Sequence, residues 1–217
     1  MKDLKYYEAN YRAFLPENRD VKILDFGCGS GNTLQFLKSV GYSNLYGADI
    51  YIADTWNELK AAGIQLEKFE NTVQYLQSIA GKFDFIVVKD VIYYFKREEV
   101  VAITELLKQA LKPGGKILFD IINGSVLTGS FTKHKDIDIK LVLTEHSMVT
   151  LIDRAGMTLE YMNGNRISVT GVRSMFYLIL NSIQKLRLRL LYFSERGLDD
   201  QNPKFFSKKI IAIASIR

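Results

Sequence analysis

The sequence contains only one cysteine, Cys28, among its 217 residues, so no internal disulfide can form. This scarcity is typical of proteins from a reducing compartment, and we expect a cytoplasmic protein. No apolar run approaches the roughly 18 residues that a membrane-spanning helix needs, and the N-terminus lacks the hydrophobic segment of a signal peptide. Two histidines, twelve positions apart and without a cysteine pair near them, predict no metal site.

The composition predicts one folded unit. An apolar content of 47% can build one sizeable core, and three prolines without low-complexity runs argue against a disordered tail. We expect a single domain over 1–217, with an N-terminal helix in 1–20, a cofactor-binding core in 21–122 and an acceptor-side half in 123–217. Charge is uneven. Ten basic and three acidic residues lie from Asn163 onward, so a total of +5 leaves −2 for residues 1–162. This asymmetry suggests an anionic substrate or surface near the C-terminal quarter.

The most informative segment is Ile23-Leu24-Asp25-Phe26-Gly27-Cys28-Gly29-Ser30-Gly31-Asn32. An apolar run ends in an acidic residue, three glycines follow at every second position, and a helical segment comes next. This pattern predicts a buried strand, a turn too tight for side chains, and a helix whose free N–H groups face the turn. Such a turn lets a ligand lie directly against main chain. The alternative without a ligand is an ordinary strand-to-helix turn of an α/β protein.

The glycine spacing distinguishes two cofactors. A dinucleotide fingerprint requires G-x-G-x-x-G, but Asn32 occupies the place of the third glycine, which comes one residue early at Gly31. The observed D-x-G-x-G-x-G resembles the first motif of the S-adenosylmethionine-dependent methyltransferases with a Rossmann-like (class I) fold. In that family the loop wraps the amino-acid part of the cofactor. The resemblance therefore implies S-adenosylmethionine as the cofactor and S-adenosylhomocysteine as its product.

Three further segments are similar to this family, in the family's order along residues 21–122. They are Asn44–Ile50, a short strand closing on Asp49; Phe83–Phe95, a strand ending at Lys89 and Asp90; and Leu111–Asp120, a helix stop with the turn "LKPGG" and a strand. Beyond residue 122 the resemblance fades. A looser similarity of arrangement, around Thr144–Met157 and the following basic insertion, points to small bacterial methyltransferases that modify sugars or other metabolites.

Alternating strands and helices predict the fold class: α/β, with a doubly wound, mostly parallel sheet of seven strands and helices on both faces. Strands are expected at 21–26, 44–49, near 64–66, 83–88, 115–122, 157–162 and 209–216. Helices are expected at 6–15, 31–39, 51–62, 71–80, 96–110, 144–155 and, as an insertion, near 172–195. By resemblance, the last strand inserts antiparallel between the fifth and sixth. The ends of the first, second and fourth strands should then share one crevice.

Cofactor contacts are predicted at ten positions, most of them in this crevice. These are Asp25, Gly27, Cys28, Gly29, Gly31, Asp49, Ile50, Asn71, Lys89 and Asp90. The Asp49 carboxylate could accept both ribose hydroxyls, although a helix N-cap is the alternative. Asn71 is a candidate for the adenine edge.

Three residues are candidates for catalysis: Asp90, Tyr93 and His146. Methyl transfer from a sulfonium is an in-line displacement, so alignment is the main requirement, and only a hydroxyl acceptor would need a general base. Asp90 could be that base, or it could pair with Lys89 or cap the next turn. Tyr93 could be an acceptor-facing residue or a core aromatic. His146 could face the cleft or simply begin a helix.

The insertion carries an apolar stripe at Ile179, Ile183, Leu186, Leu190 and Phe193, in alternating steps of four and three, and no acidic residue occurs from Arg173 to Ser194. This helix could pack on its own domain, close over the acceptor as a lid, or rest on anionic lipid headgroups.

We therefore expect a methyltransferase acting on a small molecule, such as a sugar or glycan precursor, with an anionic or lipid-linked acceptor near the basic insertion. Alternatives are a cofactor-binding sensor or scaffold without methyl transfer, and a nucleotide oxidoreductase. A nucleic-acid methyltransferase is disfavoured. The Asn/Asp-Pro-Pro-aromatic signature of base-modifying enzymes is absent after the fourth strand, where Lys89–Tyr93 stand, and the basic residues do not cluster with aromatics. The oligomeric state is left open.

Overall fold

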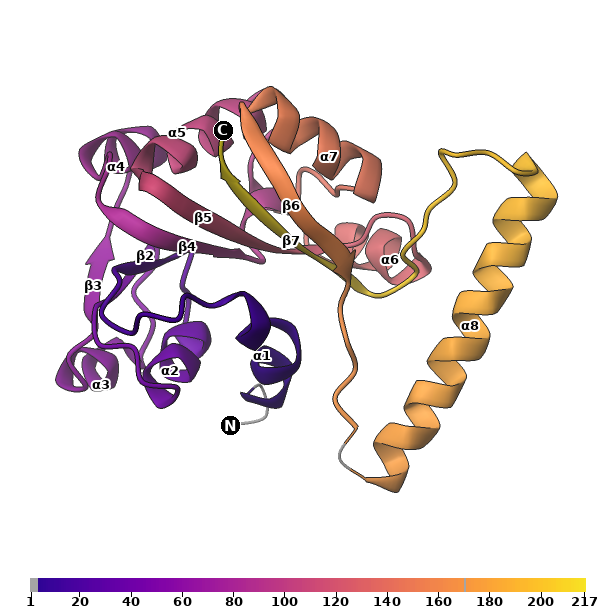
Figure 1. Cartoon of the computed structure of the whole chain (residues 1–217), viewed down its shortest axis with the longest axis horizontal. Coiled ribbons are helices and arrows are strands. Elements are labelled where there is room, and N and C mark those ends of the chain that lie inside the picture. The colour runs from indigo at the N-terminus through magenta and orange to yellow at the C-terminus, as the bar shows by residue number, and fades with distance from the viewer. Residues whose placement is uncertain (1–3, 170) are drawn as a thin grey trace.

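The structure, a computed structural model, describes residues 4–169 and 171–217. A seven-stranded sheet in the order β3-β2-β1-β4-β5-β7-β6 forms its centre, with helices on both faces (Figure 1). Strands β1 to β5 pair in parallel, while β7 runs antiparallel to both β5 and β6. The predicted fold class and the place of the last strand are thus confirmed.

The strands separate two cores, because successive side chains of a strand point to opposite faces of the sheet. In β4, Phe85 and Val87 join one core and Ile86 and Val88 the other. Such strands, buried on both faces, appear in sequence as continuous apolar runs, which is why they could be located. The strands are β1 Ile23–Phe26, β2 Leu45–Asp49, β3 Gln65–Lys68, β4 Phe83–Lys89, β5 Leu111–Ile122, β6 Met157–Gly164 and β7 Lys209–Ile216.

The helices cover the sheet as two layers. Side chains of α4, α5 and α7 fill one core, and those of α1, α2 and α3 fill the other (Figure 1). The helices are α1 Leu4–Asn10, α2 Asn32–Ser39, α3 Trp56–Ala61, α4 Thr72–Ser78, α5 Val100–Ala110, α6 Leu127–Lys135, α7 Glu145–Arg154 and α8 Val172–Arg196, with short 3₁₀ turns η1 Arg12–Phe14 and η2 Ile92–Tyr94.

The largest differences from the predicted boundaries concern the leading helix, the helices expected over 51–62 and 96–110, the second of which begins only at Val100, and the fifth strand. The leading helix stops at Asn10 and only a 3₁₀ turn follows, since Leu15 precedes Pro16, whose ring disfavours helical backbone at the residue before it. The helix expected over 51–62 is confined to α3. Strand β5 begins at Leu111, ahead of the expected position 115, because Leu111 pairs with Phe83 before the register shifts. Helix α6 was not predicted, since its sequence LTGSFTKHK has no clear apolar face.

Helix α8 extends from the body as an arm between β6 and β7 (Figure 1). Leu188 and Tyr192 attach it to a small apolar cluster with Val126 and Phe206. Within residues 4–169 and 171–217, no helix is long and apolar enough to cross a bilayer.

Candidate functional site

A cavity of about 790 Å³ lies at the carboxyl ends of β1, β2 and β4. This volume falls within the range of small-molecule sites, roughly 300–1,000 Å³. Of the ten predicted cofactor contacts, eight line it: Asp25, Gly27, Cys28, Gly29, Asp49, Ile50, Lys89 and Asp90. The sheet thus brings together three segments that are far apart in sequence, because β1 lies between β2 and β4 in the strand order.

The glycine loop forms one wall of the cavity with bare main chain. Gly27, Gly29 and Gly31 all have positive φ angles (73°, 50° and 76°), which glycine adopts without steric cost. A side chain at Gly27 would collide with Val91, and one at Gly31 with Leu59. At Gly29, by contrast, no atom lies within 4 Å of the place where a Cβ would sit. Gly27 and Gly31 therefore permit close packing, whereas Gly29 leaves space for a ligand.

Asp49 stands at the end of β2 beside this loop. Its Oδ2 accepts a hydrogen bond from the Gly29 N–H at 2.7 Å, and its Oδ1 accepts one from the Tyr51 N–H at 3.0 Å. The carboxylate thus orients the loop and lies at the cavity edge, where its remaining lone pairs can accept hydroxyl donors. It does not cap α3, which begins at Trp56 after Thr55.

Asp25 is almost fully buried, with 2% of its surface exposed, and its Oδ2 atom has no hydrogen-bond partner among the described residues. Burial raises the pKa of this carboxyl to about 7, against the lowering effect of Lys89. A buried carboxylate oxygen without a partner is costly unless a donor reaches it. Because Asp25 lines the cavity beside Gly29, a cationic group of a ligand would supply that donor.

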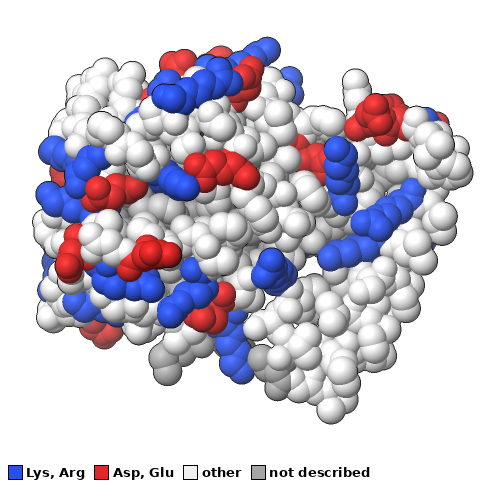
Figure 2. All heavy atoms as spheres, viewed as in Figure 1, with Lys and Arg blue, Asp and Glu red and all other residues white. Residues whose placement is uncertain are grey.

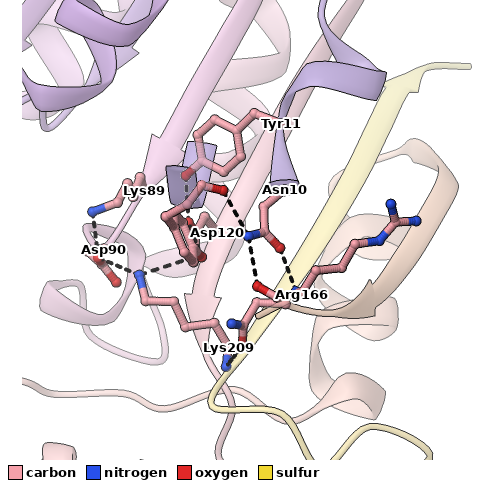
Figure 3. Close-up of polar contacts among 9 residues, drawn as sticks. Asn10, Tyr11, Lys89, Asp90, Asp120, Arg166 and Lys209 are labelled. Atoms are coloured by element: carbon pink, nitrogen blue, oxygen red, sulfur yellow. Dashed lines mark hydrogen bonds and ion pairs between the residues drawn. The ribbon is translucent and has the colours of Figure 1, made fainter. Parts of the chain in front are cut away.

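Lys89 and Asp90 belong to an ion-pair network that ties strand ends to α1 (Figure 3). The Asp90 Oδ2 lies 2.9 Å from the Lys89 Nζ and 2.6 Å from the Lys209 Nζ. The Lys209 Nζ also lies 3.2 Å from the Asp120 Oδ1. The hydroxyls of Tyr6 and Tyr11 donate to the Asp120 Oδ2 at 2.8 and 2.5 Å.

This network bears on the expected base. Burial acts to raise the pKa of Asp90, but the ammonium groups of Lys209 and Lys89 outweigh it and hold the pKa below its ordinary value. A carboxylate of lowered pKa is a weak proton acceptor near neutral pH. The electrostatics thus favour the alternative in which Asp90 pairs with Lys89. Asp90 also has a positive φ, 57°, and every other described residue with a positive φ is a glycine. The network therefore holds Asp90 in a strained conformation.

The other predicted residues lie apart from the cavity. Tyr93 does not line it but is buried in a small cluster with Ile122 and Ile139, and its neighbour Tyr94 lines the cavity instead. The structure does not bring His146 to this site: its imidazole lies in a separate hollow with Val149 and Tyr161, and its Nε2 is 2.9 Å from the Gln201 carbonyl oxygen. The reason is that α7 packs beside β6, away from the ends of β1 and β4.

Asn71 acts as an N-cap in place of the expected ligand contact. Its Oδ1 accepts a hydrogen bond from the Gln74 N–H at 3.0 Å, at the start of α4. Phe69 and Thr72, on either side of it, line the cavity instead. The Phe69 ring stacks on Phe26 and Tyr75, so it offers a fixed apolar surface near the end of β3.

The sequence reasoning missed the outer end of the cavity. Glu99, Asp136, Asp138 and Lys140 line it together with Tyr94, whose hydroxyl donates to the Asp136 Oδ2 at 3.2 Å. Residues 136–140 carry no local motif; only their run of charges after α6 could have drawn attention to them. Three acids against one lysine make this end acidic, although the whole chain carries +5. No cluster of potential metal ligands occurs in residues 4–169 and 171–217.

Comparison with known proteins places this geometry in a family. The profile of a family described as "Methyltransferase domain" matches residues 2–177. An uncharacterised protein of Rickettsia prowazekii is 33% identical over 107 residues, which is 46% of this chain. The chain thus spans about two fifths (42%) of the length of that curated relative.

Among the solved structures with a similar fold, two cover more than nine tenths of this chain. A SAM-dependent methyltransferase from Archaeoglobus fulgidus superposes with a TM-score of 0.68 at 17% identity, covering 99% of this chain and 94% of its own. The 1,6-didemethyltoxoflavin-N1-methyltransferase of Burkholderia thailandensis, solved with bound S-adenosylhomocysteine, superposes with a TM-score of 0.60 at 12% identity, covering 92% and 72%. Family and fold agree with the cofactor predicted from the sequence. The chain therefore belongs to the methyltransferase-domain family and has the class I fold of S-adenosylmethionine-dependent methyltransferases.

Proposed function

We propose that this methyltransferase binds S-adenosylmethionine in the cavity at the ends of β1, β2 and β4 and methylates a small, uncharged or cationic acceptor. The observation that carries the cofactor assignment is the buried, unpartnered Oδ2 of Asp25. The ammonium group of the cofactor's amino-acid end supplies the donor that this oxygen lacks. Gly29 leaves room for that end, and Asp49 offers its carboxylate to the ribose hydroxyls.

The chain's part in the reaction is mainly alignment and exclusion of water. When bound, the sulfonium supplies a methyl group that needs no further activation. Lys89 and Asp90, held by Lys209, form a rigid edge between the cofactor end and the outer end of the cavity. Tyr7 and Phe95 add apolar cover. Rigid positioning of this kind lowers the barrier because the reacting atoms need no further ordering.

The acceptor class is inferred from the outer end of the cavity. Glu99, Asp136 and Asp138 repel phosphate, while they suit an amine or the hydroxyls of an uncharged sugar. The proton that such a nitrogen or hydroxyl loses would pass to one of these carboxylates or to solvent as the new bond to the methyl carbon forms. No residue of α8 lines the cavity, so a phosphate-bearing carrier would meet these acids rather than the basic residues of the insertion. The same charge disfavours a nucleic-acid acceptor.

Turnover separates this proposal from a sensor or scaffold. With S-adenosylmethionine and panels of amines, free sugars, nucleotide-linked sugars and single-stranded RNA, we expect S-adenosylhomocysteine to accumulate with members of the first two panels. Transfer only to phosphate-bearing acceptors would contradict the acceptor class. Tight cofactor binding with turnover in no panel would favour the sensor.

Replacing Asp25 by asparagine should change stability and binding in opposite directions. The folded pKa of about 7 exceeds the ordinary 3.8, so the folded chain binds the proton more tightly. Its stabilising contribution is present at low pH and is lost as the pH rises from about 4 through 7. The advantage in unfolding free energy of Asp25→Asn over wild type should therefore grow with pH, from about 2 kcal/mol at pH 5 to about 4 kcal/mol at pH 8.

The same variant should bind S-adenosylhomocysteine at least tenfold more weakly at pH 8, since a charged hydrogen bond to the ammonium group is lost. Wild-type affinity should fall on acidification from pH 8 to 6, while that of the variant should not. Denaturant titration and calorimetry at both pH values measure these effects. An affinity that is independent of pH in wild type would remove Asp25 from the site.

Asp49→Ala should weaken S-adenosylhomocysteine binding by about 5- to 150-fold, or about 1–3 kcal/mol, through loss of a charged acceptor. Asp54→Ala, at an exposed residue outside the cavity, is the matched control and should bind like wild type. Calorimetry on both variants measures the two affinities. If Asp49→Ala binds S-adenosylhomocysteine as tightly as Asp54→Ala, Asp49 orients the glycine loop and does not bind the ribose.

Gly29→Val should abolish cofactor binding because its side chain would project into the ligand space. Gly81→Val is the control, since Gly81 also has a positive φ (67°) with open space at the Cβ position but lies outside the cavity. Both variants should lose about 1–2 kcal/mol of stability through backbone strain. If Gly81→Val lowers the affinity as much as Gly29→Val, strain rather than occupancy is responsible.

A further inference from the structure

Helix α8 carries an apolar seam with a heptad spacing. We define the α8 seam as the residues at successive steps of four and three, which are Val172, Phe176, Ile179, Ile183, Leu186, Leu190 and Phe193. This alternation repeats every seven residues over the whole helix, which is the pattern of a and d positions in a coiled coil. A helix with such a seam buries it against another helix.

The α8 seam faces away from the body of the protein. Its residues are 53–81% exposed, whereas Leu188 is buried and Tyr192 half-buried. Those two pack against Val126 and Phe206, and the Tyr192 hydroxyl lies 3.4 Å from the Ser125 carbonyl oxygen. Leu188 and Tyr192 occupy the outer positions of the heptad, opposite the seam. The body therefore contacts the face of α8 that is opposite the α8 seam. The α8 seam neither packs on its own domain nor closes over the cavity.

We propose that the α8 seam is a dimer interface, in which α8 of a second copy of this chain packs as an antiparallel two-stranded coiled coil. The exposed seam side chains amount to roughly 800 Å² per copy, which is the size of one side of a standard specific interface. Because the seam is at the outer side of the arm, two copies meet through it with their bodies apart. A two-fold axis across the middle of α8 closes the assembly.

The charge distribution selects the antiparallel direction. Lys185, Arg187, Arg189 and Arg196 all lie in the C-terminal half of α8, whereas residues 174–184 carry no charge. Figure 2 shows the same division, with Lys and Arg along the upper half of the helix and uncharged residues along the lower half. A parallel pair would place both basic halves together with only Glu195 to offset them. An antiparallel pair places each basic half beside the partner's uncharged half.

The seam residues are also matched in that direction. The opposing pairs are Phe176 with Phe193, Ile179 with Leu190, and Ile183 with Leu186, each occurring twice. Beside the seam, Arg173 meets Ser194, Arg187 meets Leu180, and Arg189 meets Ser182 of the other copy. No two like charges face each other across the seam, so nothing at its flanks opposes pairing.

A single charge in the seam tests this interface on the full chain. Leu190→Lys buries two ammonium groups in the proposed core and should raise the dimer dissociation constant about 100-fold or more. Leu191→Lys is the matched control: it is the neighbouring leucine, with a similar exposed fraction (49% against 59%), but lies outside the seam. Sedimentation equilibrium of the three proteins over about 1–200 µM measures the constants.

Dimerisation of the wild type and of Leu191→Lys, but not of Leu190→Lys, supports the proposal. A wild type that is monomeric throughout, or equal effects of both substitutions, overturns it. Co-sedimentation of a monomeric wild type with vesicles of phosphatidylglycerol and phosphatidylcholine also overturns it, in favour of a lipid surface. All three proteins should bind S-adenosylhomocysteine equally, because α8 does not line the cavity, so this outcome is independent of the proposed function.

Discussion

The rest of the site depends on the contacts that surround the fully buried carboxylate of Asp120. An ionised group in a protein interior costs several kcal/mol unless charges and donors surround it. Here Lys209 of β7 and the hydroxyls of Tyr6 and Tyr11 meet it, which fixes α1 against the sheet. Lys209 also reaches Asp90 and so sets the end of β4. One buried charge thereby positions the cavity edge and the helix that carries Tyr7 over it.

The sheet and the cofactor half of the cavity could be predicted because their signals are local. Strands buried on both faces appear as apolar runs, and the positive φ angles at Gly27, Gly29 and Gly31 require glycine at those places. Parallel pairing then brings the ends of β1, β2 and β4 together whatever the intervening sequence. Asp25 and Asp49 follow from this geometry, since Asp49 ends β2 and Asp25 lies one residue before the end of β1.

The acceptor half could not be predicted, because its residues are joined only by tertiary contacts. The link between Asp120 and Lys209 spans residues far apart in sequence, and no local pattern announces it. His146 and Asn71 had plausible residue types at plausible places, but α7 packs beside β6 and Asn71 caps α4. Net charge misled for the same reason: five of the ten basic residues from Asn163 onward lie on α8, which does not line the cavity, whereas the outer end of the cavity is acidic. An amphipathic pattern shows that a helix has a face to cover, but not which surface covers it.

The segment that carries α8 begins at the end of β6 and returns at the start of β7, where the two strands are paired. Gly164 pairs with Ile210 at the ends of β6 and β7, and the main chain of Lys209 exchanges hydrogen bonds with Asn165, through its carbonyl to the Asn165 N–H and through its own N–H to the side-chain oxygen. The ladder between the two strands is therefore complete without the excursion from 166 to 208. Such a junction lets an appendage be shortened, lengthened or exchanged without rebuilding the sheet, so α8 can change in evolution while the residues that line the cavity stay in place.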